Sequence, residues 1–259
     1  MAVVAVVHRG LAVRAALRRG LIRRGARARF AACRSLDQVH RLLRREVVDA
    51  VVVDIRRSAT PAPALRLIEQ YPGIPVFALS SFRPEDGGTM AALRHAGVRG
   101  LLVDDVDGVA GGEWIAARTA SRRRRHLLRD APALMRLTEP IQLRVWEEVL
   151  ARVGGRSGTA ELAGTFGLSR EHLSREFAAG GAPNLKRVID LARVCYGADL
   201  LENPGYDVAT VSHVLRYASP SHFAVAARRI SGVTPAELPR LGMRQVLLRF
   251  LKGRTRSRL

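Results

Sequence analysis

The first 120 residues alternate short apolar runs with amphipathic stretches. The apolar runs, rich in valine, predict strands at Val3–Val7, Ala28–Cys33, Ala50–Ile55, Ile74–Leu79 and Arg99–Val103. The intervening stretches carry apolar residues at helical spacing, and they predict helices at Leu11–Arg23, Leu36–Glu46, Ala62–Gln70 and Asp86–Ala96. Runs such as VVAVV and AVVVDI are apolar throughout, as expected of parallel strands covered on both faces. The pattern therefore predicts a doubly wound α/β domain with a five-stranded parallel sheet over residues 1–120.

The last hundred residues contain two copies of a helix-turn-helix pattern, about fifty residues apart. The first copy, Thr159–Phe177, has the sequence TAELAGTFGLSREHLSREF. Gly167 falls where a left-handed residue would end the first helix, and Ser169 can cap the second through its side-chain oxygen. Leu173 and Phe177 repeat the i, i+4 step of one buried stripe. The sharp turn is therefore encoded locally.

The second copy, Asp207–Pro235, repeats this scheme with different residues. Ser219 can cap its second helix, Pro220 fits the first helical position because no N–H is needed there, and Phe223 is the inward anchor. Between the copies, Leu185–Leu201 has apolar residues close to helical spacing and predicts one connecting helix. A rigid helix of about five turns can hold two recognition helices roughly one turn of B-DNA apart, about 34 Å.

The outward faces of the two second helices differ in chemistry. A 100° step per residue turns Glu171, Ser174 and Arg175 outward in the first copy. This face has the polar groups that a recognition helix needs. In the second copy the outward residues are Ser221, His222 and Val225. This second face is small and rather apolar, so it can reach a thymine methyl group or admit close backbone approach, but it offers little bidentate hydrogen bonding.

The segment from about Leu143 to Leu241 resembles the DNA-binding domain of AraC/XylS-type transcriptional regulators. The similarity is carried by LSREHLSREF in the first copy and by SPSHF followed by GVTPAELPR in the second. The resemblance implies an all-α domain whose two helix-turn-helix units contact adjacent major grooves of double-stranded DNA. Base contacts are then expected from Glu171, Ser174, Arg175, Ser221, His222 and Val225, and phosphate contacts from Arg170, Arg216, Arg228 and Arg229.

The second copy departs from the family pattern. In its turn, Arg216 stands where the family usually has glycine, and Tyr217 stands where the next residue is usually phenylalanine. Ala227 replaces a later phenylalanine, and Gly197 replaces an alanine of the connecting helix. These changes predict altered packing and site preference in the second unit.

Each predicted contact also has a simpler interpretation. Taken without the motif, Arg170 and Arg175 would be a solvated helix face. His222 fits a phosphate contact and a solvent-facing residue equally well, and Val225 can instead pack against a neighbour. If the second helix contacts no bases, the chain is a largely non-specific DNA-binding protein with equal affinity for unrelated duplexes.

The N-terminal half resembles the receiver domain of two-component response regulators, through HRGLAVRAALRRGL after the first strand and AVVVDI at the third. Asp54 takes the position of the family's phosphoacceptor. Where the family has an acidic pair for magnesium, however, this chain has His8 and Arg9, and Asp104 stands at the place of the lysine. Phosphoryl transfer needs that metal and that lysine. Asp54 is therefore expected to be vestigial and paired with an adjacent arginine, and phosphorylation control through Asp54 is the alternative.

The sequence between the two domains is a basic helical linker, residues 121–138. Glu113–Leu137 can run as the last receiver helix into this linker. The Arg122–Arg125 run is either a solvated face or a phosphate contact. Leucines and a methionine beyond it can bury one face against a second protomer: Leu127, Leu128, Leu134 and Met135. The DNA-binding domain then covers residues 139–242, with Trp146 in its core, and a basic tail follows at residues 243–259.

The charge agrees with a nucleic-acid partner without establishing one. The formal net charge is +20 with 43 basic residues, yet only Lys186 and Lys252 are lysines, and so strong an arginine bias can reflect coding composition.

Phosphate loops, paired metal-ligand histidines and nucleophile elbows are missing from the sequence, which predicts neither an enzyme nor a cofactor. Two distant cysteines and the lack of an export signal or a membrane segment predict a cytoplasmic, nucleoid-associated protein. Homodimers through the N-terminal domain or linker, and a protein partner of the receiver-like domain, are further expectations.

Overall fold

The computed structural model describes residues 1–23, 28–57, 60–155 and 157–256, and the chain forms two compact units. The first unit comprises residues 1–123 together with Asn203–Gly205, and the second comprises residues 124–202 and 206–259. The boundary between Arg123 and Arg124 falls inside a short helix, α6 (Ala120–Leu127).

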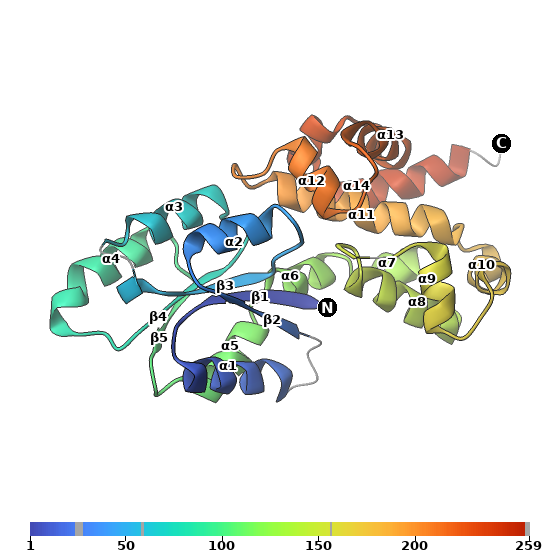
Figure 1. Ribbon diagram of the computed structural model, residues 1–259. Helices are drawn as coiled ribbons and strands as arrows, with labels where there is room; N and C mark the ends of the chain where they lie inside the picture. Colours follow the sequence, from blue (N-terminus) through green and yellow to red (C-terminus); the bar gives the residue numbers. More distant parts are fainter. Residues whose placement is uncertain (24–27, 58–59, 156, 257–259) are drawn as a thin grey trace. The chain divides into compact units, whose positions relative to one another are not determined.

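The described part of the first unit contains one five-stranded sheet with the strand order β2-β1-β3-β4-β5, every neighbouring pair being parallel (Figure 1). Its strands are β1 (Ala2–Val7), β2 (Ala28–Cys33), β3 (Ala50–Asp54), β4 (Val76–Ser80) and β5 (Gly100–Val103). This is the flavodoxin-like order, in which the chain reverses direction across the sheet between β1 and β3. Ligands of such folds bind beyond the carboxyl ends of these two strands. The predicted doubly wound, receiver-like fold is confirmed.

Helices cover both faces of the sheet. α1 and α5 lie on one face, and α2, α3 and α4 lie on the other (Figure 1). The bounds are α1 (Leu11–Arg23), α2 (Leu36–Leu43), α3 (Ala62–Gln70), α4 (Gly87–His95) and α5 (Gly108–Ala116). α1 and α5 approach closely at Gly20 and Gly112, since a Cβ on Gly20 would lie 2.0 Å from the carbonyl oxygen of Val109. On this face the core is built from β-strand valines with Leu17, Phe77 and Leu79.

Glu113–Leu137 does not form the single helix that the sequence allows. The chain forms α5, α6 and a short α7 (Ala131–Leu134) instead. The first break occurs because the Ala120 amide donates to the carbonyl oxygen of Asp49 at 2.8 Å rather than to the preceding turn. After α7, Arg136 adopts a positive φ of 58°, which ends the helix.

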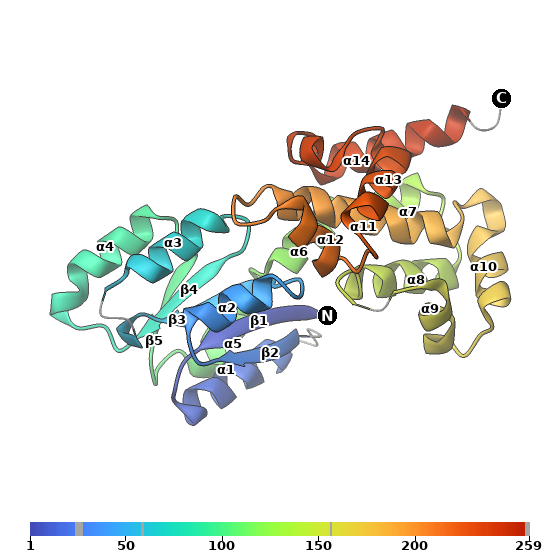
Figure 2. The ribbon, with the colours of Figure 1, turned by 45° about the horizontal axis from the view of Figure 1, so that its top comes forward.

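The described part of the second unit is all-α and is organised around α11 (Leu185–Leu201), whose predicted bounds are confirmed (Figure 2). α11 is buried along most of its length and contacts α8, α10, α12, α13 and α14. The remaining helices are α8 (Pro140–Ala151), α9 (Thr159–Thr165), α10 (Arg170–Ala178), α12 (Val208–Val214), α13 (Pro220–Ser231) and α14 (Leu238–Arg256). Trp146 on α8 is buried in this core, as predicted.

The predicted basic tail begins inside α14 rather than after the domain. Met243, Val246, Leu247 and Phe250 of this helix are buried, and α14 contacts α11 and α13. Residues 243–250 therefore belong to the core of the fold, and the last three residues of the expected tail, 257–259, lie outside the described residues.

Candidate nucleic-acid interface

The first helix-turn-helix unit is formed by α9 and α10, and its turn is set by Gly167. Gly167 adopts the left-handed conformation with φ +67°. Its amide donates to Gly164 at 3.3 Å, and the Leu168 amide donates to Ala163 at 3.0 Å, which together form a Schellman motif. The Ser169 hydroxyl then accepts from the His172 amide at 3.1 Å and caps α10, as predicted.

The second unit, α12 and α13, repeats this backbone with Arg216 in place of the glycine. Arg216 adopts φ 62° and donates its amide to His213 at 3.0 Å, while the Tyr217 amide donates to Ser212 at 3.0 Å. The Ser219 hydroxyl accepts from the His222 amide at 3.2 Å, so the predicted cap of α13 is also present. Both turns are therefore Schellman motifs followed by a serine cap.

In the second unit, Phe223 packs against α11 at Gly197. A Cβ at Gly197 would lie 2.7 Å from Phe223 Cζ, so the missing methyl group makes room for the phenylalanine ring. The Tyr217 ring packs on the same phenylalanine, with 5.1 Å between centroids. Ala227 is buried as a small side chain. Burial raises the pKa of the Tyr217 phenol above its usual range.

The residues that the sequence places on the outer face of α10 are accessible. Glu171 and Arg175 are exposed and Ser174 is half-buried, whereas Leu173 and Phe177 are buried beneath them. Arg170, the predicted phosphate contact, forms an ion pair with Glu171 at 3.1 Å. The Glu171 backbone amide and Arg170 both lower the pKa of the Glu171 carboxyl, which keeps it ionised.

On α13 the corresponding face is small, and one of its residues is apolar. Ser221, His222, Val225 and Arg228 are exposed. Arg229 is partly accessible but forms an ion pair with Asp190 of α11. Burial raises the pKa of the Asp190 carboxyl in spite of this neighbour. Arg216 is exposed, and its Nε donates to the Gly154 carbonyl oxygen at 3.4 Å. Both predicted phosphate contacts on α13, Arg228 and Arg229, are thus exposed, and Arg229 is held by an ion pair.

Neither interpretation of the Arg122–Arg125 run holds for Arg124. Its side chain is 1% exposed, and its Nε donates to Asp199 Oδ2 at 2.6 Å, with the guanidinium over the Tyr196 ring. Arg125 forms an ion pair with Glu147. A sequence signal was present, because Arg124 lies four residues from both Ala120 and Leu128 and therefore on the buried stripe of α6.

The apolar residues expected to meet a second protomer are divided. Leu128 and Met135 are buried within the second unit, whereas Leu127 and Leu134 are 39% and 46% exposed. Only the latter pair is available at the surface for a partner.

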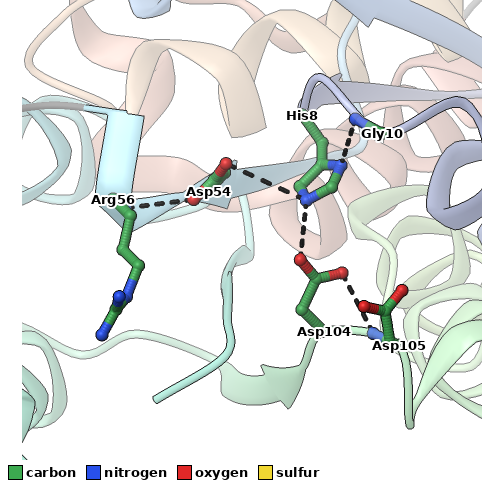
Figure 3. Close-up of polar contacts among 6 residues, drawn as sticks. All are labelled: His8, Gly10, Asp54, Arg56, Asp104 and Asp105. Carbon is green, nitrogen blue, oxygen red and sulfur yellow. Dashed lines mark hydrogen bonds and ion pairs between the residues drawn. The ribbon is translucent and has the colours of Figure 1, made fainter. Parts of the chain in front are cut away.

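The carboxyl edge of the sheet brings His8, Asp54 and Asp104 together (Figure 3). His8 Nε2 lies 3.1 Å from Asp104 Oδ2 and 3.9 Å from Asp54 Oδ2. The expected ion pair between Asp54 and an adjacent arginine is not formed by Arg56, and the side chain of Arg57 lies outside the described residues. Arg56 contacts Asp54 only through its backbone amide, at 3.0 Å, because its guanidinium pairs with Asp86. The sequence analysis placed His8 near this site but did not pair it with Asp104, because the two residues are 96 positions apart.

The hydrogen bonds fix the proton of His8. The Gly10 amide points at His8 Nδ1 at 3.0 Å, and a backbone N–H can only donate. Nδ1 is therefore an acceptor, and the ring proton sits on Nε2, where it is donated to Asp104 (Figure 3). The imidazole thus lies between the carboxylates of Asp54 and Asp104. Among the described residues there is no cluster of three or more histidine, cysteine, aspartate or glutamate side chains placed to hold a metal ion.

Comparison with known proteins identifies the C-terminal unit. Residues 162–240 match the family model described as a helix-turn-helix domain, which confirms the predicted AraC/XylS-type resemblance. No curated protein matches the chain. The chain thus carries a helix-turn-helix domain together with a receiver-like domain.

Several solved structures show distant similarity. A DNA-binding transcriptional dual regulator from Escherichia coli K-12 is 20% identical over 40% of this chain and 94% of its own, with a TM-score of 0.35. A response regulator protein from Burkholderia pseudomallei is 20% identical over 68% of this chain and 98% of its own, with a TM-score of 0.36. Full-length FixJ from B. japonicum is 15% identical over 90% and 98%, with a TM-score of 0.36. Similarities at this level do not assign a function.

Within the described part of the chain, no helix is both long and apolar enough to cross a bilayer.

Proposed function

We propose that this protein is a sequence-specific DNA-binding transcriptional regulator in which the two helix-turn-helix units of one chain contact adjacent major grooves. The observation that carries the proposal is the repeated geometry of α10 and α13. Each helix follows a Schellman turn, begins at a serine cap and contacts α11. A turn of this kind places the first residues of the second helix at the base edges.

The proposed base contacts lie on the outer faces of the first two turns of the two recognition helices. In α10 they are Glu171, Ser174 and Arg175, of which Arg175 can donate two hydrogen bonds to a guanine. In α13 they are Ser221, His222 and Val225. The proposed phosphate contacts are Arg170, Arg216, Arg228 and Arg229. Of these, Arg229 also forms an ion pair with Asp190.

We further propose that the receiver-like unit acts without phosphorylation, as a partner-binding or dimerising module. Magnesium prefers hard oxygen ligands, and this edge of the sheet presents the His8 imidazole where the acidic pair is expected. Because His8 donates to Asp104 and lies beside Asp54, the residues present do not fit a magnesium ion. The site therefore supports no phosphoryl transfer to Asp54.

Selection of random duplexes by the full-length protein at about 150 mM salt, followed by footprinting, tests the DNA-binding proposal. We expect an enriched site, bound about 10³-fold or more tightly than unrelated duplexes and protected over two adjacent turns on one face. Protection of a single groove would contradict the two-unit arrangement. Equal affinity for all duplexes would support a non-specific DNA-binding protein instead.

Incubation with an acyl phosphate and magnesium tests the role of Asp54. We expect no phosphorylation by intact mass, and the same affinity for the selected duplex before and after treatment. Asp54→Asn is the matched control. A phosphate that appears on the wild-type chain and not on this variant would support a phosphorylation-controlled response regulator.

A further inference from the structure

Val225 is an apolar side chain on the outer face of a recognition helix. It is 61% exposed, although Phe223 and Ala226 beside it are buried. Two residues correspond to about 200° around a helix, so Val225 lies opposite the phenylalanine that anchors α13. Single exposed valines are common on protein surfaces, and exposure alone indicates nothing. This valine is of interest because it lies on the face of α13 that we propose to contact bases.

We propose that α13 recognises thymine through its 5-methyl group, with Val225 as the residue that contacts it. This inference rests on the proposed DNA-binding function and specifies the chemistry of its second half-site. In the major groove, thymine is the base that presents an apolar group, and an aliphatic side chain is the complementary contact. Val225 has no hydrogen-bonding group, so it cannot distinguish the donor and acceptor patterns of the other bases.

The surroundings of Val225 allow the close approach that such a contact needs. Ser221 and Ala224 are small, and Pro220 at the start of α13 carries no long polar side chain. Phe223, Ala226 and Ala227 hold the opposite side of the helix in the core. Arg228 is exposed one turn further along, where a phosphate of the same groove can be reached.

The first recognition helix has the opposite chemistry. Its outer face presents Glu171 and Arg175, both charged and exposed. The operator is therefore asymmetric, with one half-site recognised through hydrogen bonds and the other through thymine methyl groups.

Uracil substitution tests this inference, because uracil differs from thymine only by the missing methyl group. In the duplex selected by the full-length protein, each thymine of the second half-site is replaced in turn by uracil and the Kd is measured. We expect one replacement to weaken binding about fourfold, the equivalent of exposing one buried methyl group. Replacement in the first half-site should have a smaller effect.

Two variants assign the effect to Val225. Val225→Ser removes both methyl groups, so this variant should bind the thymine and uracil duplexes equally. Val225→Thr keeps one methyl group and should retain the preference for thymine. Val225 is exposed, so neither change disturbs the core.

The outcomes separate this inference from the function on which it rests. A selected site whose second half contains no thymine, or tolerates uracil at every position, would overturn the inference and leave the regulator intact. A preference for thymine that persists in Val225→Ser would also overturn it. Failure to enrich any site would overturn the proposed function, and this inference with it.

Discussion

The two helix-turn-helix units share one backbone but build it from different residues. In the first unit the left-handed turn position is Gly167, with φ +67°, and in the second it is Arg216, with φ 62°. A left-handed conformation costs a residue with a Cβ roughly 1–2 kcal/mol, and glycine avoids this cost. The second turn still closes both Schellman hydrogen bonds. Its geometry is therefore imposed by the surrounding packing rather than by its own residue.

The compensating packing lies between α13 and α11. Gly197 admits the Phe223 ring, and Tyr217 covers it. The first unit has no such departure, because Phe177 fills its core directly and Gly167 makes its turn without strain. Local sequence therefore determines the first unit, whereas the second depends on contacts with the helix that both units share.

Removal of the carboxylate of Asp199 should have the largest effect and should not distinguish the two units. Asp199 lies on the shared α11, and its side chain and that of Arg124 are both 1% exposed. Asp199→Ala leaves the Arg124 charge buried, so we expect the free energy of unfolding to fall by about 3–5 kcal/mol. Chemical denaturation of the full chain measures this, and footprints of both half-sites should weaken together.

The matched control replaces both partners by apolar side chains, as Arg124→Met with Asp199→Leu. Because no buried charge is left alone, the double variant should recover most of the lost stability. Equal losses in the single and double variants would show that the pair does not act as a unit.

Addition of a methyl group at Gly197 should affect the second unit selectively. A Cβ there would lie 2.7 Å from Phe223 Cζ, so Gly197→Ala overpacks the contact and should cost about 1–3 kcal/mol. Gly164→Ala in α9 is the control, because a Cβ at Gly164 meets no atom within 4 Å and should instead stabilise the helix by roughly 1 kcal/mol. In footprinting, protection of the second half-site by Gly197→Ala should require a higher protein concentration than protection of the first. Simultaneous loss would contradict the separation of the units.

Replacement of Arg175 should change specificity rather than stability. Arg175→Ala removes an exposed side chain of α10, and we expect discrimination at one base position to fall by about 1–3 kcal/mol. Binding to duplexes that vary at each position of the first half-site measures this. Arg170→Ala is the comparison, since a phosphate contact should weaken all duplexes uniformly and lower the salt dependence. A uniform loss for Arg175→Ala would reclassify it as a phosphate contact.

Local patterns in the sequence predict the elements well where the apolar periodicity is regular. The strand at Ala28–Cys33 and the helices at Leu11–Arg23, Ala62–Gln70 and Leu185–Leu201 have their predicted bounds. The serine caps at Ser169 and Ser219 were also predicted, because a cap depends only on the next three residues.

Contacts between distant residues could not be predicted in this way. Arg124 and Asp199 are 75 residues apart, and although helical spacing places Arg124 on a buried stripe, it does not indicate which carboxylate pairs with it. His8 and Asp104 are 96 residues apart and meet only because β1 and β5 end at the same edge of a parallel sheet. The sequence placed both residues near the receiver site but did not pair them.

The smallest effect should come from the turn residue itself, and it tests whether packing imposes the second turn. Arg216→Gly relieves the left-handed strain but also frees the unfolded chain, so we expect a net gain of about 1 kcal/mol in the free energy of unfolding. Gly167→Ala, the converse change in the first unit, should lose a similar amount.

Arg216→Asn separates strain from charge, because asparagine tolerates the left-handed conformation and, like glycine, removes the proposed phosphate contact. Both Arg216 variants should therefore lower the salt dependence of DNA binding equally, while glycine stabilises more. If Arg216→Gly leaves the stability unchanged while Gly167→Ala lowers it, contacts of the Arg216 side chain, such as the one with Gly154, offset the strain of the left-handed turn.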